Sequence, residues 1–299
     1  MKQTIEQQIL PAAPDEELEK PEIWWMETAR MFYGNKAAVL GLIGLLIIVL
    51  VGLFGPVFFR ADPFDIVAAP LAEPGGPAYL GTDYLGRDVF IGLIYGTRPT
   101  LAIAITATAF TVFIGMFIGA LAGFYGGRID NLLMRITEFF QVLPPLVFAM
   151  VIVAVFTPNF ITVAFAIGIV SWTSLARLTR AEFLKIKERE FVLSARAVGA
   201  RNRRLITRVI LPNAMPPLII AVTLRVGMTI IYEAALSFLG LTDPDIMTWG
   251  KMIGLSRDFF FEAWWTVTFP GLAILTITLC IALIGDGLND AFNPKLRGR

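Results

Sequence analysis

The chain has 299 residues, of which 56% are hydrophobic and 16% charged, and a mean hydropathy of +0.70, which is too apolar for an ordinary water-soluble protein. It has no histidine and one cysteine, Cys280, so it offers no intrachain disulfide, no cysteine-based metal cluster and neither the commonest general base nor the commonest metal ligand. With a net charge of only +1, nothing indicates nucleic acid as a partner. The composition predicts an all-α, polytopic membrane protein with no metal site.

Residues 1–36 are expected to precede the first membrane span. Met1–Glu22 is polar, acidic and interrupted by prolines, which is typical of a disordered tail. Ile23–Asn35 mixes tryptophan, phenylalanine and tyrosine with charged residues, as a helix at the membrane interface does. A loosely ordered linker is the alternative for this second segment.

Six apolar runs have lengths that suit helices crossing a bilayer. The runs are Ala37–Phe59, Pro99–Phe124, Leu132–Phe156, Phe160–Ala176, Asn213–Phe238 and Thr266–Leu288. Residues 60–98 are polar and rich in proline and glycine, and we expect them to form an extracytoplasmic loop. The chain therefore divides into a first span at 37–59, a permeation core at 99–288 that includes a basic loop at 177–212, and a polar tail at 289–299.

Two of these spans carry structural signals of their own. Gly115, Gly119 and Gly123 recur at every fourth residue of the second span and predict a groove in which another helix packs closely. Pro144 and Pro145 fall in the middle of the third span, where they must kink or interrupt the helix. Such a kink serves the architecture or lines a pathway.

The distribution of positive charge predicts the orientation. If both termini are cytoplasmic, 19 lysines and arginines lie inside and five lie outside. The five outside are Arg60, Arg87, Arg98, Lys251 and Arg257. Because cytoplasmic segments are enriched in lysine and arginine, this asymmetry favours six spans with both termini in the cytoplasm.

The basic loop at 177–212 contains the clearest local pattern. It carries ten basic residues and three acidic ones. Glu190–Val198 is rich in helix-forming and small residues, and Gly199 follows where a helix C-cap is expected. Leu211 and Pro212 close the loop, and proline suits the first turn of the next helix. We expect a short helix, a glycine turn and a re-entry into the membrane, or a basic loop that merely contacts anionic headgroups.

Arg225 and Glu233 are charged residues within the fifth span, so they are expected to face the bundle interior or water. Arg225 is a candidate for lining a pathway or for a structural hydrogen bond, and a structural role is favoured for Glu233. Enzyme hypotheses lack support, because the sequence has no phosphate-binding loop, no H-E-x-x-H motif and no G-x-S-x-G motif. Asp286 has no second intramembrane aspartate to form a protease dyad.

The basic loop resembles the EAA loop of ABC transporter permeases. The matching residues are Leu193-Ser194-Ala195, Gly199 and Val209-Ile210-Leu211-Pro212, with Leu193 and Ser194 departing from the family's Glu-Ala. Further stretches resemble the dipeptide, oligopeptide and nickel import branch of these permeases. They are residues 80–89, 93–96, 236–241, 249–250, 264–265, 269–271 and 285–287.

The resemblance implies an import permease of the prokaryotic inner membrane, surrounded by lipid. Its partners would be a homologous permease, two ATPase subunits that bind ATP and magnesium, and an extracytoplasmic binding protein, with no cofactor in this chain. The coupling helix would dock on the ATPase, with Ala195 facing its groove, through Glu190, Leu193, Ser194, Ala195, Arg196, Gly199, Leu211 and Pro212. The binding protein would dock near Thr82, Asp83, Gly86, Arg87 and Asp88.

Two other classes remain as alternatives, a secondary transporter or channel and a membrane scaffold. The absence of an evident inverted repeat disfavours the first of these. The transported solute stays open among peptides, nickel, glutathione, opines and oligosaccharides.

Overall fold

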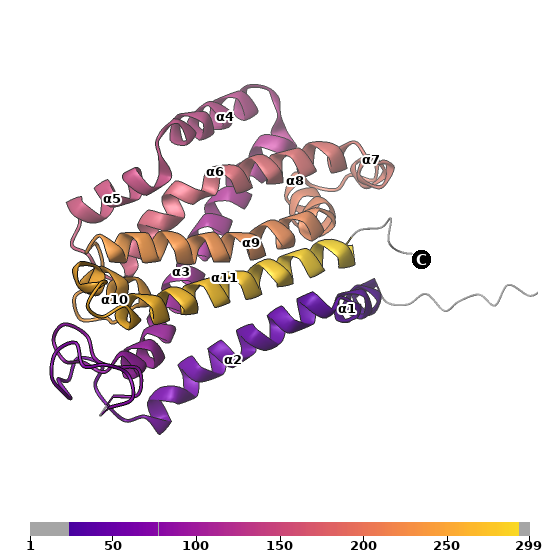
Figure 1. Cartoon of the computed structure of the whole chain (residues 1–299). Coiled ribbons are helices and arrows are strands. Elements are labelled where there is room, and N and C mark those ends of the chain that lie inside the picture. The colour runs from indigo at the N-terminus through magenta and orange to yellow at the C-terminus, as the bar shows by residue number, and fades with distance from the viewer. Residues whose placement is uncertain (1–23, 77, 293–299) are drawn as a thin grey trace, which may run out of the picture.

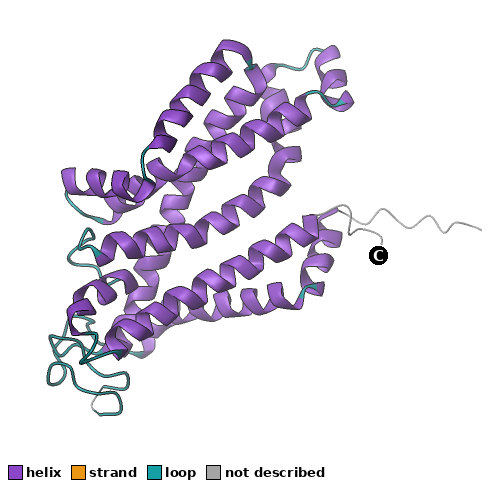
Figure 2. Cartoon of the chain, turned by 45° about the horizontal axis from the view of Figure 1, so that its top comes forward, coloured by secondary structure: helices purple, strands orange, loops and turns teal. Residues whose placement is uncertain are grey.

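The structure is a computed structural model that describes residues 24–76 and 78–292 (Figure 1). Regular structure in these residues is helical, apart from isolated antiparallel bridges that join Ile66 to Arg87 and Thr82 to Asp88 (Figure 2). Five helices among the described residues are long and apolar enough to cross a membrane, and the bent pair of α4 and α5 brings the number to six when it is counted as one span. The predicted all-α membrane fold is confirmed. The tail Met1–Glu22 lies outside the described residues.

The elements follow the chain in a simple order. They are α1 (Trp24–Gly34), α2 (Lys36–Phe58), α3 (Val89–Tyr125), α4 (Gly127–Val142), α5 (Pro145–Val155), α6 (Phe160–Lys187), α7 (Glu190–Ala197), α8 (Asn202–Arg204), a π-helical segment (Leu205–Ile210), α9 (Leu211–Phe238), α10 (Trp249–Ser256), a 3₁₀ turn (Arg257–Phe259) and α11 (Trp265–Phe292).

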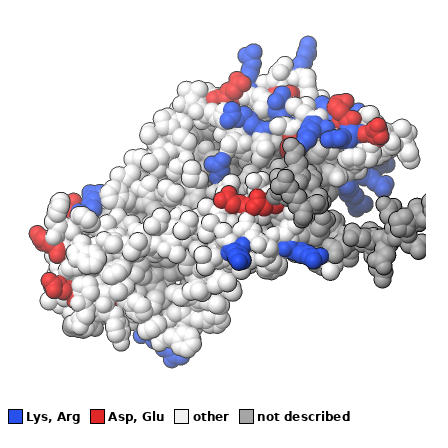
Figure 3. Space-filling view, turned by 45° about the vertical axis from the view of Figure 1, so that its right-hand side comes forward, with Lys and Arg blue, Asp and Glu red and all other residues white. Residues whose placement is uncertain are grey.

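The long helices lie side by side and give the molecule two distinct ends (Figure 1). One end, which we call the basic end, carries α1, α7, α8 and the last turns of α11. The opposite end, which we call the loop end, carries residues 60–88 and α10. Figure 3 shows most lysine and arginine side chains gathered toward one end of the molecule, with a broad uncharged surface beyond them. This is the charge segregation that a membrane protein requires.

The most extensive helix contact joins α3 to α6, and it depends on the predicted glycine groove. A Cβ atom added at Gly119 would lie 2.3 Å from the Ala176 carbonyl oxygen, and one at Gly123 would lie 2.6 Å from the Phe183 Cβ. No side chain fits at either position, so glycine lets the two backbones approach. The close packing predicted from the four-residue spacing is confirmed.

The second span begins earlier than the sequence predicted, so the expected loop at 60–98 is about ten residues too long. The helix α3 starts at Val89 because the Asp88 carboxylate accepts hydrogen bonds from Phe90 N and Ile91 N, at 2.8 and 3.3 Å. Pro99, which was expected to open the helix, lies inside it. The aspartate cap, and not the proline, determines where α3 begins.

Other bounds also differ from the prediction. The third span starts at Gly127 and is interrupted at residues 143–144, where its two helices meet at 86°, which confirms the interruption expected at Pro144. The α6 helix extends to Lys187, eleven residues beyond the predicted end of the fourth span at Ala176. The helix α10 was not predicted within the last external loop, and α11 includes residues 289–292 of the expected tail.

An arginine fastens α2 to α3 at a place where the backbone of α2 lacks a donor. Pro56 lies inside α2 and has no N–H, so the carbonyl of Gly52, four residues earlier, has no helical partner. The Arg98 Nε donates to this Gly52 oxygen at 2.5 Å, and the same guanidinium donates to the Leu53 oxygen. Arg98 was expected in the outer loop. It instead substitutes for the missing N–H within the bundle.

This arrangement predicts a specific double-mutant result. Arg98→Leu should destabilise the permease by about 1–3 kcal/mol, because it leaves the Gly52 carbonyl without a donor in apolar surroundings. In a Pro56→Ala background the cost should fall, because the substituted alanine supplies a backbone N–H to the same carbonyl. Thermal denaturation of the four purified variants, followed by size-exclusion chromatography, measures the difference. Equal costs of Arg98→Leu in both backgrounds would show that Arg98 does not compensate for Pro56.

Candidate functional site

The predicted coupling helix is present as α7, between α6 and the π-helical segment. It spans Glu190–Ala197, Val198 is its C-cap and Gly199 adopts a φ of +88°. The Gly199 N–H donates to the Arg196 oxygen at 2.9 Å, and the Ala200 N–H donates to the Ala195 oxygen at 3.1 Å. These bonds close the helix in the left-handed glycine turn that the sequence predicted.

The inner side of α7 is packed firmly against the bundle. Val192 is fully buried in a cluster with Phe183 and Ile186 of α6 and Leu205 of the π-helical segment. The guanidinium of Arg196 lies 6.0 Å from the centre of the Phe124 ring at the end of α3. The helix α7 therefore contacts three neighbouring elements.

The outer side of α7 is exposed and includes large apolar side chains among polar ones. Leu193 is 47% exposed and Val198 is 90% exposed, and Ser194 lies on the same exposed side. Ala195 is half-buried and packs toward the Val192 cluster, so the expectation that Ala195 faces outward is wrong. The reason is the helical period: Ala195 follows Val192 by three residues and shares its inner face. Glu190 is exposed at the first turn.

The chain re-enters the bundle earlier than Pro212. Residues 202–238 form one continuous apolar helix, in which residues 205–210 are π-helical. The Leu211 N–H donates to the Ile206 oxygen, five residues back, and the Asn213 side chain donates to the Val209 oxygen at 2.6 Å. Pro212 lies in the first turn of α9, as its missing N–H favours, but the helix is already running. The wide π turn accommodates it.

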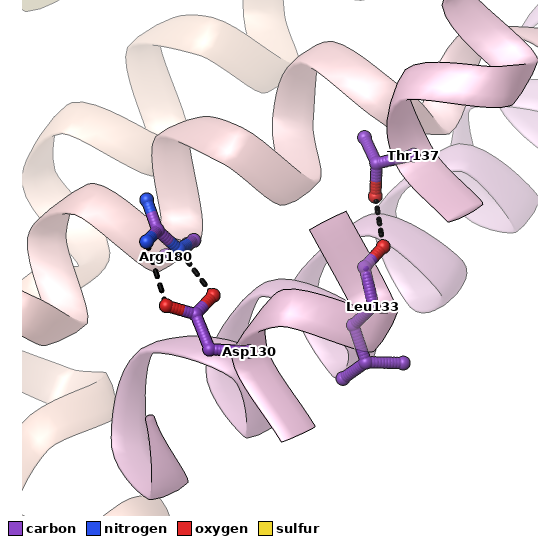
Figure 4. Close-up of polar contacts among 4 residues, drawn as sticks. All are labelled: Asp130, Leu133, Thr137 and Arg180. Carbon is purple, nitrogen blue, oxygen red and sulfur yellow. Dashed lines mark hydrogen bonds and ion pairs between the residues drawn. The ribbon is translucent and has the colours of Figure 1, made fainter. Parts of the chain in front are cut away.

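A bidentate ion pair joins α4 to α6 near the basic end (Figure 4). The Arg180 guanidinium donates to both oxygens of Asp130, at 2.5 and 2.6 Å. Two parallel bonds fix orientation as well as distance, so the pair ties the first turn of α4 to the extension of α6 that leads to α7. No sequence pattern singled out this pair, because the approach of residues 50 positions apart is a property of the tertiary structure.

Arg225 lies beside a cavity at the interruption between α4 and α5. The cavity has a volume of about 380 Å³. Its lining residues are Phe140, Gln141, Pro145, Val170, Ser171, Thr173, Ser174, Arg225 and Tyr232. The Arg225 guanidinium donates to the Ser174 hydroxyl on α6. Of the two charged residues predicted in the fifth span, Arg225 lines this cavity and Glu233 does not.

Glu233 lies elsewhere, within the packing of α9 against α10. It is fully buried, and its Oε1 accepts a hydrogen bond from the Ser237 hydroxyl at 2.7 Å. The Thr248 hydroxyl, before α10, donates to Ser237 in turn at 3.3 Å. Glu233 is not among the lining residues of the Arg225 cavity, and its contacts connect α9 to α10.

The five residues expected to dock the binding protein build the loop that precedes α3. The Thr82 side chain is fully buried; its hydroxyl donates to the Ala69 oxygen at 2.7 Å and accepts from the Ala72 N–H at 2.8 Å. Gly86 has a φ of +85°, and a Cβ there would lie 2.2 Å from the Ala68 oxygen. Thr82 and Gly86 are buried within the loop, so they do not form its outer surface.

The other three docking candidates also contact their own loop. The Asp83 carboxylate accepts from Leu85 N and Arg87 N, at 2.8 and 2.9 Å, and Asp88 caps α3. The Arg87 guanidinium lies 5.1 Å from the centre of the Phe64 ring. These three residues are partly exposed, and the most exposed residues of the loop are others, including Ile66 and Tyr79, at 70% and 77%.

A lysine connects this loop to α10. The Lys251 ammonium donates to the carbonyl oxygens of Asp243, Pro244 and Ile246, at 3.3, 2.5 and 3.1 Å, and lies 5.1 Å from the centre of the Phe64 ring. Burial lowers the pKa of Lys251 from its usual value, and the nearby positive charge of Arg87 lowers it further. The described residues contain no cluster of three side chains suited to a metal ion.

Comparison with known proteins agrees with this geometry. Residues 115–298 match the family described as binding-protein-dependent transport system inner membrane component, and residues 24–74 match the N-terminal TM domain of oligopeptide transport permease C. The dipeptide transport system permease protein DppC of Alkalihalophilus pseudofirmus is 37% identical over 279 residues, which cover 91% of this chain and 90% of that protein.

Two further relatives have similar coverage. The di/tripeptide transport system permease protein DppC of Pseudomonas aeruginosa is 41% identical, over 89% of this chain and 90% of that protein. The oligopeptide transport system permease protein OppC of Bacillus subtilis is 34% identical, over 91% of this chain and 90% of that protein.

A solved structure extends the comparison to the fold. A chain of the MetNI methionine ABC transporter in an inward-facing conformation superposes with a TM-score of 0.57 at 17% sequence identity, covering 69% of this chain and 98% of that chain. The family matches and the helical architecture together place this chain. It belongs to the binding-protein-dependent transport system inner membrane components, as a multi-pass inner-membrane permease subunit of an ABC importer.

Proposed function

We propose that this permease forms half of the translocation pathway of an ATP-driven peptide importer and docks on a separate ATPase through α7. The relatives named above are permeases for dipeptides, di- and tripeptides or oligopeptides, which supports peptides as the solute. The observation that carries the proposal is α7 itself, which has a rigidly packed inner side and an exposed outer side that includes large apolar side chains. An anchor that only touched lipid headgroups would need neither feature.

The energy source belongs to partners of this chain. The sequence has no phosphate-binding loop, and, as the resemblance to ABC transporter permeases implies, we assign the binding of ATP and Mg²⁺ to two separate ATPase subunits. A homologous permease supplies the other half of the pathway. An extracytoplasmic binding protein delivers the peptide.

The contacts of α7 provide a route by which motion of the ATPase reaches the membrane. The helix α7 is packed on the end of α6, and the Asp130–Arg180 pair links α6 to the first turn of α4. The helix α4 ends at the interruption beside the Arg225 cavity. Rigid-body motion of α7 therefore displaces one wall of that cavity. The route is a set of packed elements, each with a defined contact to the next.

The orientation follows from the distribution of charge. The basic end carries α7, so it faces the cytoplasm together with both termini, and the loop end faces the binding protein. Because Thr82 and Gly86 are interior to their loop, the docking surface consists of its exposed residues, such as Ile66, Val67 and Tyr79.

The outer face of α7 can be tested by substitution. Leu193→Asp and Val198→Asp should each reduce ATPase co-purification and peptide uptake at least about tenfold, because docking would bury an unpaired carboxylate. Both side chains are exposed in the isolated subunit, so membrane insertion should not change. Lys185→Gln, at an exposed position on α6, is the control. Wild-type uptake by both aspartate variants would reduce this loop to a membrane anchor.

The glycine turn can be separated from docking. Gly199→Val should lower peptide uptake per ATP hydrolysed several-fold, because the left-handed conformation costs a side-chain-bearing residue about 1–2 kcal/mol and a β-branched one more. Gly199→Asn should retain most of the coupling, since asparagine adopts this conformation more readily. A Cβ at this position has no neighbour within 4 Å, so steric contact does not distinguish the variants. An equal loss of peptide uptake per ATP in the valine and asparagine variants would contradict a role for the left-handed conformation of Gly199.

The proposed orientation predicts a labelling pattern. In a Cys280→Ser background, Tyr79→Cys should react with a membrane-impermeant thiol reagent in intact cells, whereas Val198→Cys should react only after the membrane is disrupted. Both positions are highly exposed in the isolated subunit, at 77% and 90%, so when this subunit is expressed without its partners, access depends on the side of the membrane. Thr82→Cys is unsuitable because Thr82 is buried. The reverse pattern would overturn the orientation.

A further inference from the structure

The cavity at the interruption of the third span combines features of a solute-binding site. It lies between the end of α4, the start of α5, the middle of α6 and the middle of α9, with a volume of about 380 Å³. Interrupted helices inside a membrane are tolerated where they are enclosed by protein or line a water-filled cavity. The helices α4 and α5 meet here at 86°, and Gln141 and Pro145 on either side of the interruption line the cavity.

The polar side chains of the cavity are mostly hydrogen-bond donors without strong acceptors. Arg225 donates to one neutral group, the Ser174 hydroxyl. Ser171 is 4% exposed, and its Oγ has no hydrogen-bond partner among the described residues. Tyr232 adds a phenol about two turns along α9 from Arg225. A buried hydroxyl without a partner, in the lining of the same cavity as an arginine, indicates a site that a polar ligand completes.

The electrostatics of the cavity favour a negative ligand. No aspartate or glutamate is among its lining residues, so the guanidinium of Arg225 has no carboxylate there. The helix α5 begins at Pro145 in the cavity wall, so the positive end of its helix dipole lies at the cavity. Each of the other arginines that join helices in the bundle, Arg98 and Arg180, already has carbonyl or carboxylate acceptors. Arg225 differs because, among residues 24–76 and 78–292, its one hydrogen-bond acceptor is the Ser174 hydroxyl.

We propose that this cavity binds the carboxylate of the transported peptide, with Arg225 as the cationic partner and Ser171 and Ser174 as hydroxyl donors. The inference rests on the proposed function, since it assigns the ligand to the solute. The peptide carboxylate replaces the Ser174 hydroxyl as the acceptor of the Arg225 guanidinium. The same carboxylate accepts a hydrogen bond from the Ser171 hydroxyl. A transport pathway needs such binding to be reversible, and one arginine with two hydroxyls meets that need.

The first experiment measures the charge preference of the cavity without any transport. Gln141→Cys is introduced into the assembled complex in a Cys280→Ser background, and this subunit is weighed by mass spectrometry after exposure to two thiol reagents of similar size. They are 2-sulfonatoethyl and 2-(trimethylammonium)ethyl methanethiosulfonate. Each rate is divided by the rate of the same reagent with a free thiol in solution. After this correction the anionic reagent should react at least about tenfold faster than the cationic one, because the cationic site concentrates anions.

Arg225→Gln should abolish this preference. Arg135→Gln, which changes an exposed arginine on α4 outside the cavity, should preserve it. A dipeptide should slow the reaction more than the same dipeptide with an amidated C-terminus, and more than acetate at equal concentration. A preference that survives Arg225→Gln, equal rates for the two reagents, no reaction with either, or equal protection by acetate would each overturn the assignment to a peptide carboxylate.

The second experiment follows uptake into proteoliposomes that contain the complete complex, with the binding protein saturated by peptide. Arg225→Gln should lower the uptake of a free dipeptide about tenfold, a loss that corresponds to one charge-assisted contact, and Arg225→Lys should recover part of it. ATP hydrolysis stimulated by the binding protein should change less than uptake. An equal fall in both would assign Arg225 to the structure of the bundle. If the wild-type complex took up no peptide, the proposed function would be wrong, whatever the labelling shows.

Discussion

Water does not reach most of the backbone of this permease, so each carbonyl and N–H in the spans must find its partner within the protein. Several places interrupt the regular helical ladder, and three of them have distinct consequences. At Pro56 an arginine from α3 supplies the missing donor and joins two helices. Before Pro212 a π turn and the Asn213 side chain accommodate the proline at the re-entry into the bundle. At residues 143–144 the ladder stops, and the ends of α4 and α5 line a cavity.

The same constraint explains why the coupling region is stiff. The contact between α3 and α6 is close because glycines at 115, 119 and 123 leave no side chain between the backbones, and α7 extends from the end of α6 onto the last residues of α3. With α6 held on one side by α3 and on the other by the Asp130–Arg180 pair, α7 has little freedom of its own. A displacement imposed on α7 must therefore move its neighbours, as energetic coupling over a distance requires.

Four basic residues that contact other parts of the protein fall into two groups according to their hydrogen-bond acceptors. Arg98, Arg180 and Lys251 donate to carbonyl or carboxylate oxygens, so their charges serve to join elements. Arg225 contacts a single neutral hydroxyl and borders a cavity with no acidic lining residue. A cation in apolar surroundings is costly unless it has a partner, and a ligand that arrives during transport is a natural one.

Some properties of this protein depend on local sequence, and the sequence by itself determined them. Apolar composition and run length predicted the membrane class and the spans, and the helix-forming residues before Gly199 predicted α7 and its left-handed turn, because these follow from solvation and backbone preference. Tertiary structure decided the start of α3 at Asp88, the helix α10, the inward side of Ala195 and the interior position of Thr82. It also brought Asp130 to Arg180 and placed Arg225 at a cavity, since contacts between residues distant in the chain depend on how whole helices pack, which no local pattern encodes.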